Sequence, residues 1–409
     1  MHSSIGTILL VFVSILLGLV PALPTPGSGN DDFPTGDNDT ISREFAIIGG
    51  GASGTFAAVR LREQGNTVVL IEHSDGTPID YGVWVYSDYP ISRSFFAHFN
   101  ITLTTEFLNG DPEATRRLDF LTGQPVAPPV GNVVEAMTRY AQILIQYPYM
   151  MDGWDLPYPV PGDLLLSFQD FIEKHDLQAA IETLALYMKG FDEVLQLPAV
   201  YVMKLFHLGV VQGVQTGFLR PASRANSDLY RAAEGELGDD LLLSSTVAHI
   251  QRSAEDTGPQ QIVVRTPKGH QRVQADKVIV TIPPLLGELE NFDLDERESE
   301  IFGRFENNSY FLAVLRMSGL PGNGTQFVNK ASETPYNIAP RAGILYRTQI
   351  VAFRPHVPYA LYVSSEEIAD GFYRDLYGLQ GYRNTFYTGA AFHTHDSAEM
   401  WKFTEKFVE

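Results

Sequence analysis

The stretch FAIIGGGASGTFAAVRLREQGNTVVLIE, residues 45–72, decides the fold of this chain. It contains an apolar strand, a glycine-rich turn, a helix ended by Gly65, a second apolar strand and an acid. These are, in order, the parts of the βαβ unit that binds dinucleotides. A glycine cluster alone marks only a turn, but here every flanking element stands in its expected place. The stretch therefore predicts a nucleotide site on a Rossmann-like α/β sheet.

Each position of this unit has a predicted physical role. The first glycine makes a tight turn, the second lets the backbone approach a pyrophosphate, and the last lets the helix pack closely on the strand. The helix N-terminus offers unpaired N–H groups and partial positive charge to the phosphates, and the acid takes the ribose hydroxyls. The predicted nucleotide-binding residues are Gly49, Gly51, Ala52, Ser53, Gly54 and Glu72.

Composition limits the possible functions. A chain of 409 residues with 44% hydrophobic residues predicts a globular protein with two to three domains' worth of core. A formal charge of −20 argues against nucleic acid and anionic membrane surfaces as partners. The absence of cysteine excludes disulfides, thiolate metal sites and a cysteine nucleophile.

The N-terminal region predicts entry into the secretory pathway. Residues 5–20 are almost wholly apolar but too few to span a membrane, so we interpret residues 1–22 as a signal peptide. The charge-poor start leaves a retained anchor as the alternative. Polar and Pro/Gly-rich residues 23–43 predict a disordered linker. Sequons at Asn38, Asn100, Asn307 and Asn323 are consistent with N-glycans on a secreted protein.

The remaining elements follow from hydrophobic periodicity. Residues 163–217 form a block of helical segments, in which Asp176 is a candidate cap for a helix over 177–188. His207, in an apolar run of this block, is more typical of a satisfied core histidine than of a catalytic one. The other expected elements are a strand over 79–86, helices over 90–99, 132–147 and 227–237, strands over 241–251, 261–266, 271–282, 310–317 and 349–364, a helix capped by Ser365, and a final helix to Phe407.

Three separate segments resemble FAD-dependent oxidoreductases of the glutathione-reductase type, in the amine-oxidase branch. They are the unit at 45–72, the strand and turn ADKVIVTIPP at 275–284, and FYTGA at 386–390. The resemblance implies bound FAD. It further implies that backbone at Val247 clasps the adenine and that a turn at Gly389 and Ala390 meets the flavin.

The chain is most similar to one subgroup, the fungal β-cyclopiazonate dehydrogenase-like flavoproteins. The segments that carry this likeness are IIGGGASGTFAAVRLRE (47–63), GTPIDYGVWVY (76–86), LYRAAEGELG (229–238), HVPYALYVS (356–364) and NTFYTGAAFHTHDSAEMWKFTE (384–405). The subgroup implies a role in secondary metabolism, in which a substrate C–H is oxidised while an alkaloid ring closes. It does not fix the substrate.

Two departures from the family pattern matter. A Gly-Gly-containing segment that normally follows the ribose-binding acid is missing, because Glu72 to Thr77 leads directly into the motif at 80–82. The strand after the Pro-Pro turn, residues 308–315, also lacks the lysine that many amine oxidases carry there. The first departure leaves a damaged flavin site or a mis-spliced sequence as alternatives, and the second weakens the case for simple amine oxidation.

A protein base is not evident from the sequence. The candidates beside the expected flavin turn are Tyr387, His393, His395 and Asp396, since a histidine there can accept a proton near neutral pH. The alternative is that one of them only caps the final helix. His393 and His395 lack a convincing third ligand, so we expect no metal. No Gly-x-Ser-x-Gly elbow supports a serine triad.

These observations predict an α/β fold: a Rossmann-like FAD-binding lobe with an inserted β-meander, and a mixed substrate lobe with a sheet and a helical cap. The expected FAD-binding domain comprises 44–110, 235–290 and 375–409, and the substrate domain 111–234 and 291–374. The predicted function is a secreted oxidoreductase that transfers hydride from a small, largely apolar metabolite, nitrogen-containing ones included, to flavin N5. The alternatives are a flavin amine oxidase producing peroxide and a pseudoenzyme that has lost FAD.

Overall fold

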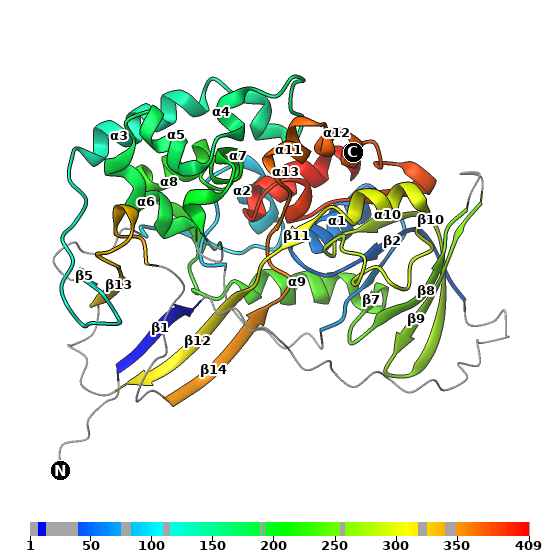
Figure 1. Cartoon of the computed structure of the whole chain (residues 1–409). Helices are drawn as coiled ribbons and strands as arrows, with labels where there is room; N and C mark the ends of the chain where they lie inside the picture. Colours follow the sequence, from blue (N-terminus) through cyan, green and yellow to red (C-terminus); the bar gives the residue numbers. More distant parts are fainter. Residues whose placement is uncertain are drawn as a thin grey trace, which may run out of the picture.

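The computed structural model describes residues 7–13, 40–74, 83–108, 115–188, 191, 193–253, 258–317, 325–339 and 349–408. A sheet with the order β7-β3-β2-β10-β9-β8 forms the right side of the molecule in Figure 1, and a short strand, β16, also pairs with β10. The strands are β2 (Thr40–Ile48), β3 (Val68–Ile71), β7 (Leu241–Leu242), β8 (Thr246–Gln251), β9 (Gln260–Thr266), β10 (Gly269–Val280) and β16 (Thr385–Tyr387). This is the predicted Rossmann-like sheet.

Strand β10 joins the two halves of this sheet. Its first part pairs antiparallel with β9, which pairs antiparallel with β8, so these three strands form the predicted meander. Along residues 272–280 it pairs parallel with β2, and its end pairs parallel with β16. The predicted strand over 241–251 is two strands, because β7 leaves the meander and pairs parallel with β3 at the other edge.

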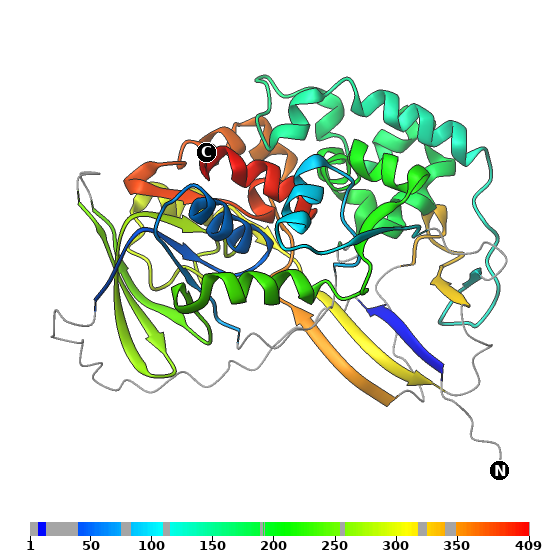
Figure 2. The same cartoon turned by 180° about the vertical axis from the view of Figure 1, so that it is seen from behind.

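Helices cover the sheet and hold its strands together. They are α1 (Ala52–Glu63), α9 (Ser227–Leu237), α10 (Glu296–Phe302) and α13 (Ser397–Val408). Figure 2 shows α1 beside α13, and the indole N–H of Trp401 on α13 donates to the carbonyl of Ala52 at 3.0 Å. Trp401 is fully buried and stacks on Phe56 with ring centroids 5.9 Å apart. The C-terminal helix is therefore packed directly on the helix of the glycine-rich unit.

A helical cap lies at the upper left of Figure 1. Its helices are α3 (Val133–Leu144), α4 (Gly162–Leu165), α5 (Phe168–Lys174), α6 (Ile181–Tyr187), α7 (Ala199–Leu205) and α8 (Leu208–Thr216). The predicted cap at Asp176 is wrong: this residue has φ +52°, and the chain passes through a 3₁₀ turn, Gln178–Ala180, before α6 begins. The expected apolar face is present, because Leu177, Ile181 and Leu184 are buried.

A second, antiparallel sheet lies below the cap in Figure 1 and has the order β1-β12-β14. Its strands are β1 (Thr7–Val13), β12 (Tyr310–Met317) and β14 (Gln349–His356). Strand β1 lies inside the predicted signal peptide and pairs with β12 over seven positions.

The remaining helices and strands belong neither to these two sheets nor to the helices named above. They are α2 (Pro90–His98), β4 (Leu103–Glu106), β5 (Thr115–Leu118), β6 (Phe218–Pro221), β11 (Glu306–Asn307), β13 (Gln326–Asn329), β15 (Leu361–Tyr362), α11 (Ser365–Ala369) and α12 (Phe372–Tyr377). The cap of α11 is Ser364, one residue before the predicted Ser365. Of the predicted strand over 79–86, residues 79–82 lie outside the described residues, and Tyr86 pairs with Leu219 as an isolated β-bridge.

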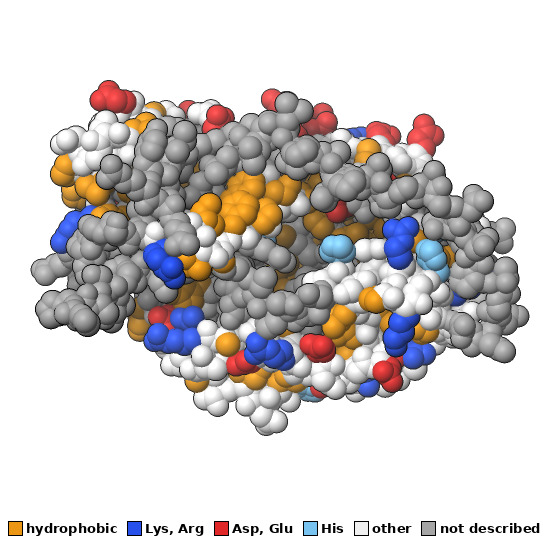
Figure 3. Space-filling view, turned by 90° about the horizontal axis from the view of Figure 1, so that it is seen from below, with side chains coloured by type: hydrophobic (Ala, Val, Ile, Leu, Met, Phe, Trp, Pro, Cys, Tyr) orange, Lys and Arg blue, Asp and Glu red, His pale blue; other side chains and the backbone are white. Residues whose placement is uncertain are grey.

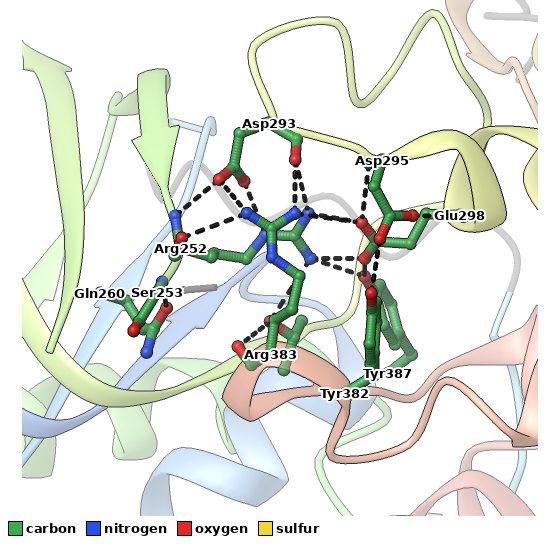
Figure 4. Close-up of polar contacts among 10 residues, drawn as sticks. Arg252, Ser253, Gln260, Asp293, Asp295, Glu298, Tyr382, Arg383 and Tyr387 are labelled. Atoms are coloured by element: carbon green, nitrogen blue, oxygen red, sulfur yellow. Dashed lines mark hydrogen bonds and ion pairs between the residues drawn. The ribbon is translucent and has the colours of Figure 1, made fainter. Parts of the chain in front are cut away.

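A buried ion cluster ties the meander to the C-terminal strand (Figure 4). Arg252, just past β8, makes a two-pronged bond to Glu298 on α10, with N–O distances of 2.6 and 2.8 Å. Both side chains are fully buried. The hydroxyl of Tyr387 on β16 donates to Glu298 at 2.9 Å, and Arg383 reaches Asp293, which also binds Arg252. Although burial opposes the charge, the bond to Glu298 raises the pKa of Arg252, so this cation stays charged.

We expect Glu298→Gln to lower the free energy of unfolding by about 3–5 kcal/mol, because it removes the fully buried carboxylate of the two that pair with Arg252 and leaves only Asp293. Urea titration followed by circular dichroism measures this loss. Glu300→Gln is the matched control, since Glu300 lies on the same helix and its bond to Arg304 is exposed, so it should cost less than about 1 kcal/mol. Equal effects of the two substitutions would show that the buried pair is not structural.

Candidate functional site

The glycine-rich turn has the geometry that its sequence predicts. Gly49 has φ +103°, a conformation that side chains disfavour, and its N–H donates to the carbonyl of Ile71 at 2.9 Å. A Cβ at Gly54 would lie 1.8 Å from the carbonyl oxygen of Gly49. Only glycine at position 54 therefore lets α1 approach β2 this closely.

The start of α1 leaves room and donors for a phosphate. Gly51 is the exposed N-cap residue of α1, and a Cβ added there would meet no atom within 4 Å. Ser53, in the first turn, is buried, and its hydroxyl has no hydrogen-bond partner among the described residues. Ala52 lies between them. An unpaired hydroxyl and free N–H groups at a helix N-terminus fit a pyrophosphate group.

Glu72 connects the glycine-rich turn to the chain that leads into β8, the two segments predicted to bind the adenosine part of the nucleotide. Its carboxylate accepts from the N–H of Gly50 at 2.5 Å and from the N–H of Ser74 at 2.7 Å. Its carbonyl accepts from the N–H of Ser245 at 2.9 Å, so the chain leading into β8 lies directly beside it. Val247 follows two residues later, and its carbonyl accepts from Asn291 at 3.2 Å. The structure thus places the Val247 segment next to Glu72.

Thr281, at the end of β10, connects the glycine-rich turn to the predicted flavin turn. Its hydroxyl donates to the carbonyl of Gly49 at 2.9 Å. Gly389 has φ +111°, and a Cβ there would lie 3.3 Å from the carbonyl oxygen of Thr281. Ala390 begins a 3₁₀ turn, Ala390–Phe392, directly after it. The two turns therefore meet at the end of β10.

The four predicted catalytic candidates lie in four different environments. The hydroxyl of Tyr387 belongs to the buried ion cluster with Glu298 and Arg252 (Figure 4), which gives it a structural role. Asp396 accepts from the N–H of Ala398 at 2.7 Å, so it caps α13, the alternative that the sequence left open. Burial raises the pKa of Asp396, but bonds from His207 and Ser87 outweigh it, and the net shift is downward.

His393 is buried and both ring nitrogens are engaged. Nδ1 lies 3.1 Å from the ammonium of Lys204 on α7, and Nε2 lies 3.2 Å from the carbonyl of Met151. Burial, followed by the charge of Lys204, holds the pKa of His393 well below its usual value. His207 is the satisfied core histidine expected from the sequence, since its Nδ1 accepts from the N–H of Gly209 and caps α8.

His395 points elsewhere, into a group of rings that we call the interlobe aromatic cluster: Phe191, Tyr310, His356, Tyr359 and His395. The rings of Tyr359 and His395 lie 4.4 Å apart, and those of Tyr310 and Tyr359 4.9 Å apart. The cluster draws on the cap, on the second sheet and on the chain after Gly389. Seen from below, Figure 3 shows hydrophobic side chains gathered near the middle of the molecule, where the face is hollowed.

Sequence reasoning missed Lys204, Arg252, Glu298 and Glu399. Each lies in a helical or strand pattern where a charged residue normally faces solvent, and only the distant partner in space explains its burial. The pattern of apolar residues nearly all round 197–208 was the one available signal, because it placed Lys204 inside a buried helix.

Other predictions fall partly outside the described residues. Asn100 and Asn307 are exposed, whereas Asn38 and Asn323 are not described. The missing segment after Glu72 was inferred at residues 72–77, of which 75–77 are not described. Within the described ranges no helix is long and apolar enough to cross a membrane, and no three His, Asp or Glu side chains there form a metal-binding group.

Comparison with known proteins identifies the class. Residues 47–98 match the NAD(P)-binding Rossmann-like domain, and residues 162–300 match the flavin containing amine oxidoreductases. Among solved structures, a fatty acid isomerase from P. acnes superposes with a TM-score of 0.66 over 90% of this chain and 98% of that chain, at 18% identity. Putrescine oxidase does so with a TM-score of 0.59 at 15% identity, over the same shares. These likenesses show the fold, that of the FAD-dependent amine oxidases.

The chain belongs to a family of fungal FAD-dependent oxidoreductases. It is 32% identical to the FAD-dependent oxidoreductase oblC of Cochliobolus heterostrophus over 90% of this chain and 91% of that protein. It is 30% identical to the beta-cyclopiazonate dehydrogenase of Aspergillus oryzae over 91% and 93%. The first alignment spans 444 positions, more than the 409 residues of this chain, so oblC carries residues that this chain lacks.

Membership of this family establishes that the protein is a flavin-dependent oxidoreductase and that its cofactor is FAD. The residues at the glycine-rich turn fit that group.

We expect Gly51→Val to abolish FAD retention while leaving the unfolding free energy of the FAD-free protein within about 1 kcal/mol of the natural value, because the new side chain meets only open space. Absorbance of the purified protein and urea titration measure the two quantities.

Gly54→Ala is the matched comparison for that experiment. Its methyl group would collide with the carbonyl of Gly49, so we expect a loss of about 3 kcal/mol or more in stability before FAD is considered. Normal FAD content in Gly51→Val would place the pyrophosphate elsewhere.

Proposed function

We propose that this chain transfers a hydride from a C–H of a small, largely apolar metabolite to N5 of FAD, as a dehydrogenase or oxidocyclase. Nitrogen-containing metabolites are included in this class. The observation that carries the proposal is the interlobe aromatic cluster. One of its rings belongs to His395, which follows Gly389 by only six residues. A substrate bound there would lie between the two lobes, beside the proposed flavin turn.

The proposed FAD site uses residues from both ends of the chain. Gly51, Ser53 and the α1 N-terminus would hold the pyrophosphate, Glu72 the ribose, and backbone near Val247 the adenine. Gly389 and Ala390 would contact the flavin. When bound, FAD supplies the two-electron acceptor for the hydride. The protein then has to bind and orient the substrate carbon and exclude water.

The chemistry of the aromatic cluster favours an uncharged, apolar substrate. Burial raises the pKa of Tyr359 to about 12. Burial, assisted by the nearby His356, lowers the pKa of His395 to about 4, so its ring is neutral at neutral pH. Ring faces bind flat apolar groups through stacking and edge contacts. His395 is the predicted catalytic candidate best placed to touch such a substrate, as a hydrogen-bond partner that orients it.

An anaerobic screen of apolar metabolites tests this function through the loss of oxidised-flavin absorbance. With a reducing substrate in hand, Tyr359→Ala should lower kcat/KM about tenfold with unchanged FAD content, because it removes the central ring of the cluster. Phe107 is an exposed aromatic residue, so Phe107→Ala is the control and should leave kcat/KM and FAD content unchanged. Reduction by simple amines with peroxide release, and by no other class, would instead establish the amine oxidase alternative.

We also propose that the protein is secreted and N-glycosylated. The support is the apolar start of the chain, and the exposure of Asn100 and Asn307. Expression of the full chain in a fungal host should give medium-borne protein that begins near Leu23 and shifts in mass on peptide N-glycosidase treatment. Asn100→Gln should remove one N-glycan and reduce this mass shift accordingly. Retention in the cell with an intact N-terminus would refute secretion.

A further inference from the structure

Lys204 is a buried cation at the boundary between the lobes. It lies on α7 of the cap with 3% of its surface exposed. Its ammonium donates to the carbonyls of Met150 at 2.7 Å and Gly153 at 2.8 Å. Its third neighbour is Nδ1 of His393, at 3.1 Å, which follows the proposed flavin turn. A charged lysine has three N–H donors, so each donor here has one acceptor.

The surroundings of His393 determine where its hydrogen lies. Nε2 faces the carbonyl of Met151 at 3.2 Å and the carboxylate of Glu399 at 3.5 Å, and both of these groups accept. The ring hydrogen therefore belongs on Nε2, which leaves Nδ1 as an acceptor for Lys204. Because the carbonyls beside Lys204 also only accept, a single hydrogen lies between Nζ and Nδ1.

We propose that Lys204 and His393 form a one-proton pair that fixes the flavin turn against the cap, so that protonation of the pair and binding of FAD strengthen each other. The neutral amine offers two hydrogens to three acceptors, so loss of the proton leaves one acceptor unsatisfied and weakens the hold on the turn. Lys204 is thus a positioning residue that acts through His393. The inference rests on the proposed contact between this turn and FAD.

Titration of this pair falls in the physiological range. Burial lowers the pKa of Lys204 from 10.5 to about 7, and the nearby Glu399 opposes that shift. The other titratable groups around the pair are Asp152, His207, Lys402 and Lys406. Between about pH 7 and 10.5 the unfolded chain keeps this proton and the folded chain does not, so the FAD-free fold gains stability from this group as the pH rises. FAD affinity should move the opposite way.

A pocket of about 270 Å³ gives the pair a route to solvent. It lies between α2, the 3₁₀ turn Pro148–Asp152 and α13, and His393 lines it together with Lys402 and Lys406. Protons can therefore exchange with water from this side, without passing through the aromatic cluster.

FAD titration of the apoprotein between about pH 6 and pH 9 tests the coupling. We expect the Kd of the natural protein to rise about fivefold or more over this range. In Lys204→Met the Kd for FAD should be high and should change less than about twofold with pH. The exposed control Lys174→Met should show the same Kd and the same pH dependence as the natural protein. A pH-independent Kd in the natural protein, or natural pH dependence in Lys204→Met, would overturn the proposal.

Nitrogen-15 NMR of the FAD-free protein separates this inference from the proposed FAD site. The His393 ring should carry its hydrogen on Nε2 at low pH, and its Nδ1 signal should shift in one step near neutrality that Lys204→Met removes. A protein that fails to bind FAD but shows this step would refute the site and keep the pair. A hydrogen fixed on Nδ1 throughout would refute the pair even with FAD bound.

Discussion

The close contact between α1 and the end of β2 is the constraint on which the proposed cofactor site depends. Gly54 sits so near the carbonyl of Gly49 that no larger residue fits, and the hydroxyl of Thr281 binds that same carbonyl. The position of the helix N-terminus, the end of β10 and the Gly389 turn are therefore set together. A shift of any of the three would separate the proposed phosphate-binding donors from the proposed flavin turn. The glycines here therefore specify the relation between segments more than 300 residues apart.

The sequence could predict this part of the fold because its signals are local. Strand, turn and helix of residues 45–72 are each encoded by neighbours in the chain, and the meander and the final helix follow from periodicity. Even the histidine at 207 could be assigned to the core. The edge strand β7 could not, because two residues paired with β3 carry no pattern of their own and the flanking residues merge with β8.

Local signals also locate caps only approximately. Ser364 and Ser365 are adjacent and chemically identical, and the backbone at 364 decides which hydroxyl reaches the N–H of Glu367. Asp176 precedes an apolar stripe as a cap should, but its positive φ places it in a turn instead.

The environments of the candidate bases could not be predicted from local sequence either. Their sequence positions were adjacent to the flavin turn, yet Tyr387, His393 and Asp396 are engaged by partners at 298, 204 and 207, which only the tertiary structure reveals.

Those partners show why the two lobes act as one unit. The segment from Arg383 to Glu399 begins in the ion cluster of Arg252 and Glu298. It ends in the bonds of His393 to Lys204 of the cap and of Glu399 to the hydroxyl of Tyr89, and the Gly389 turn lies between. Glu298 and Glu399 are fully buried, so part of the chain's acidic excess serves internal anchoring as well as the surface. A carboxylate or imidazole held in this way needs its counterpart in place, since burial without it costs several kcal/mol. The cap therefore contributes Lys204 and His207 to the geometry of the cofactor lobe, and removing it would leave the flavin turn anchored at one end only.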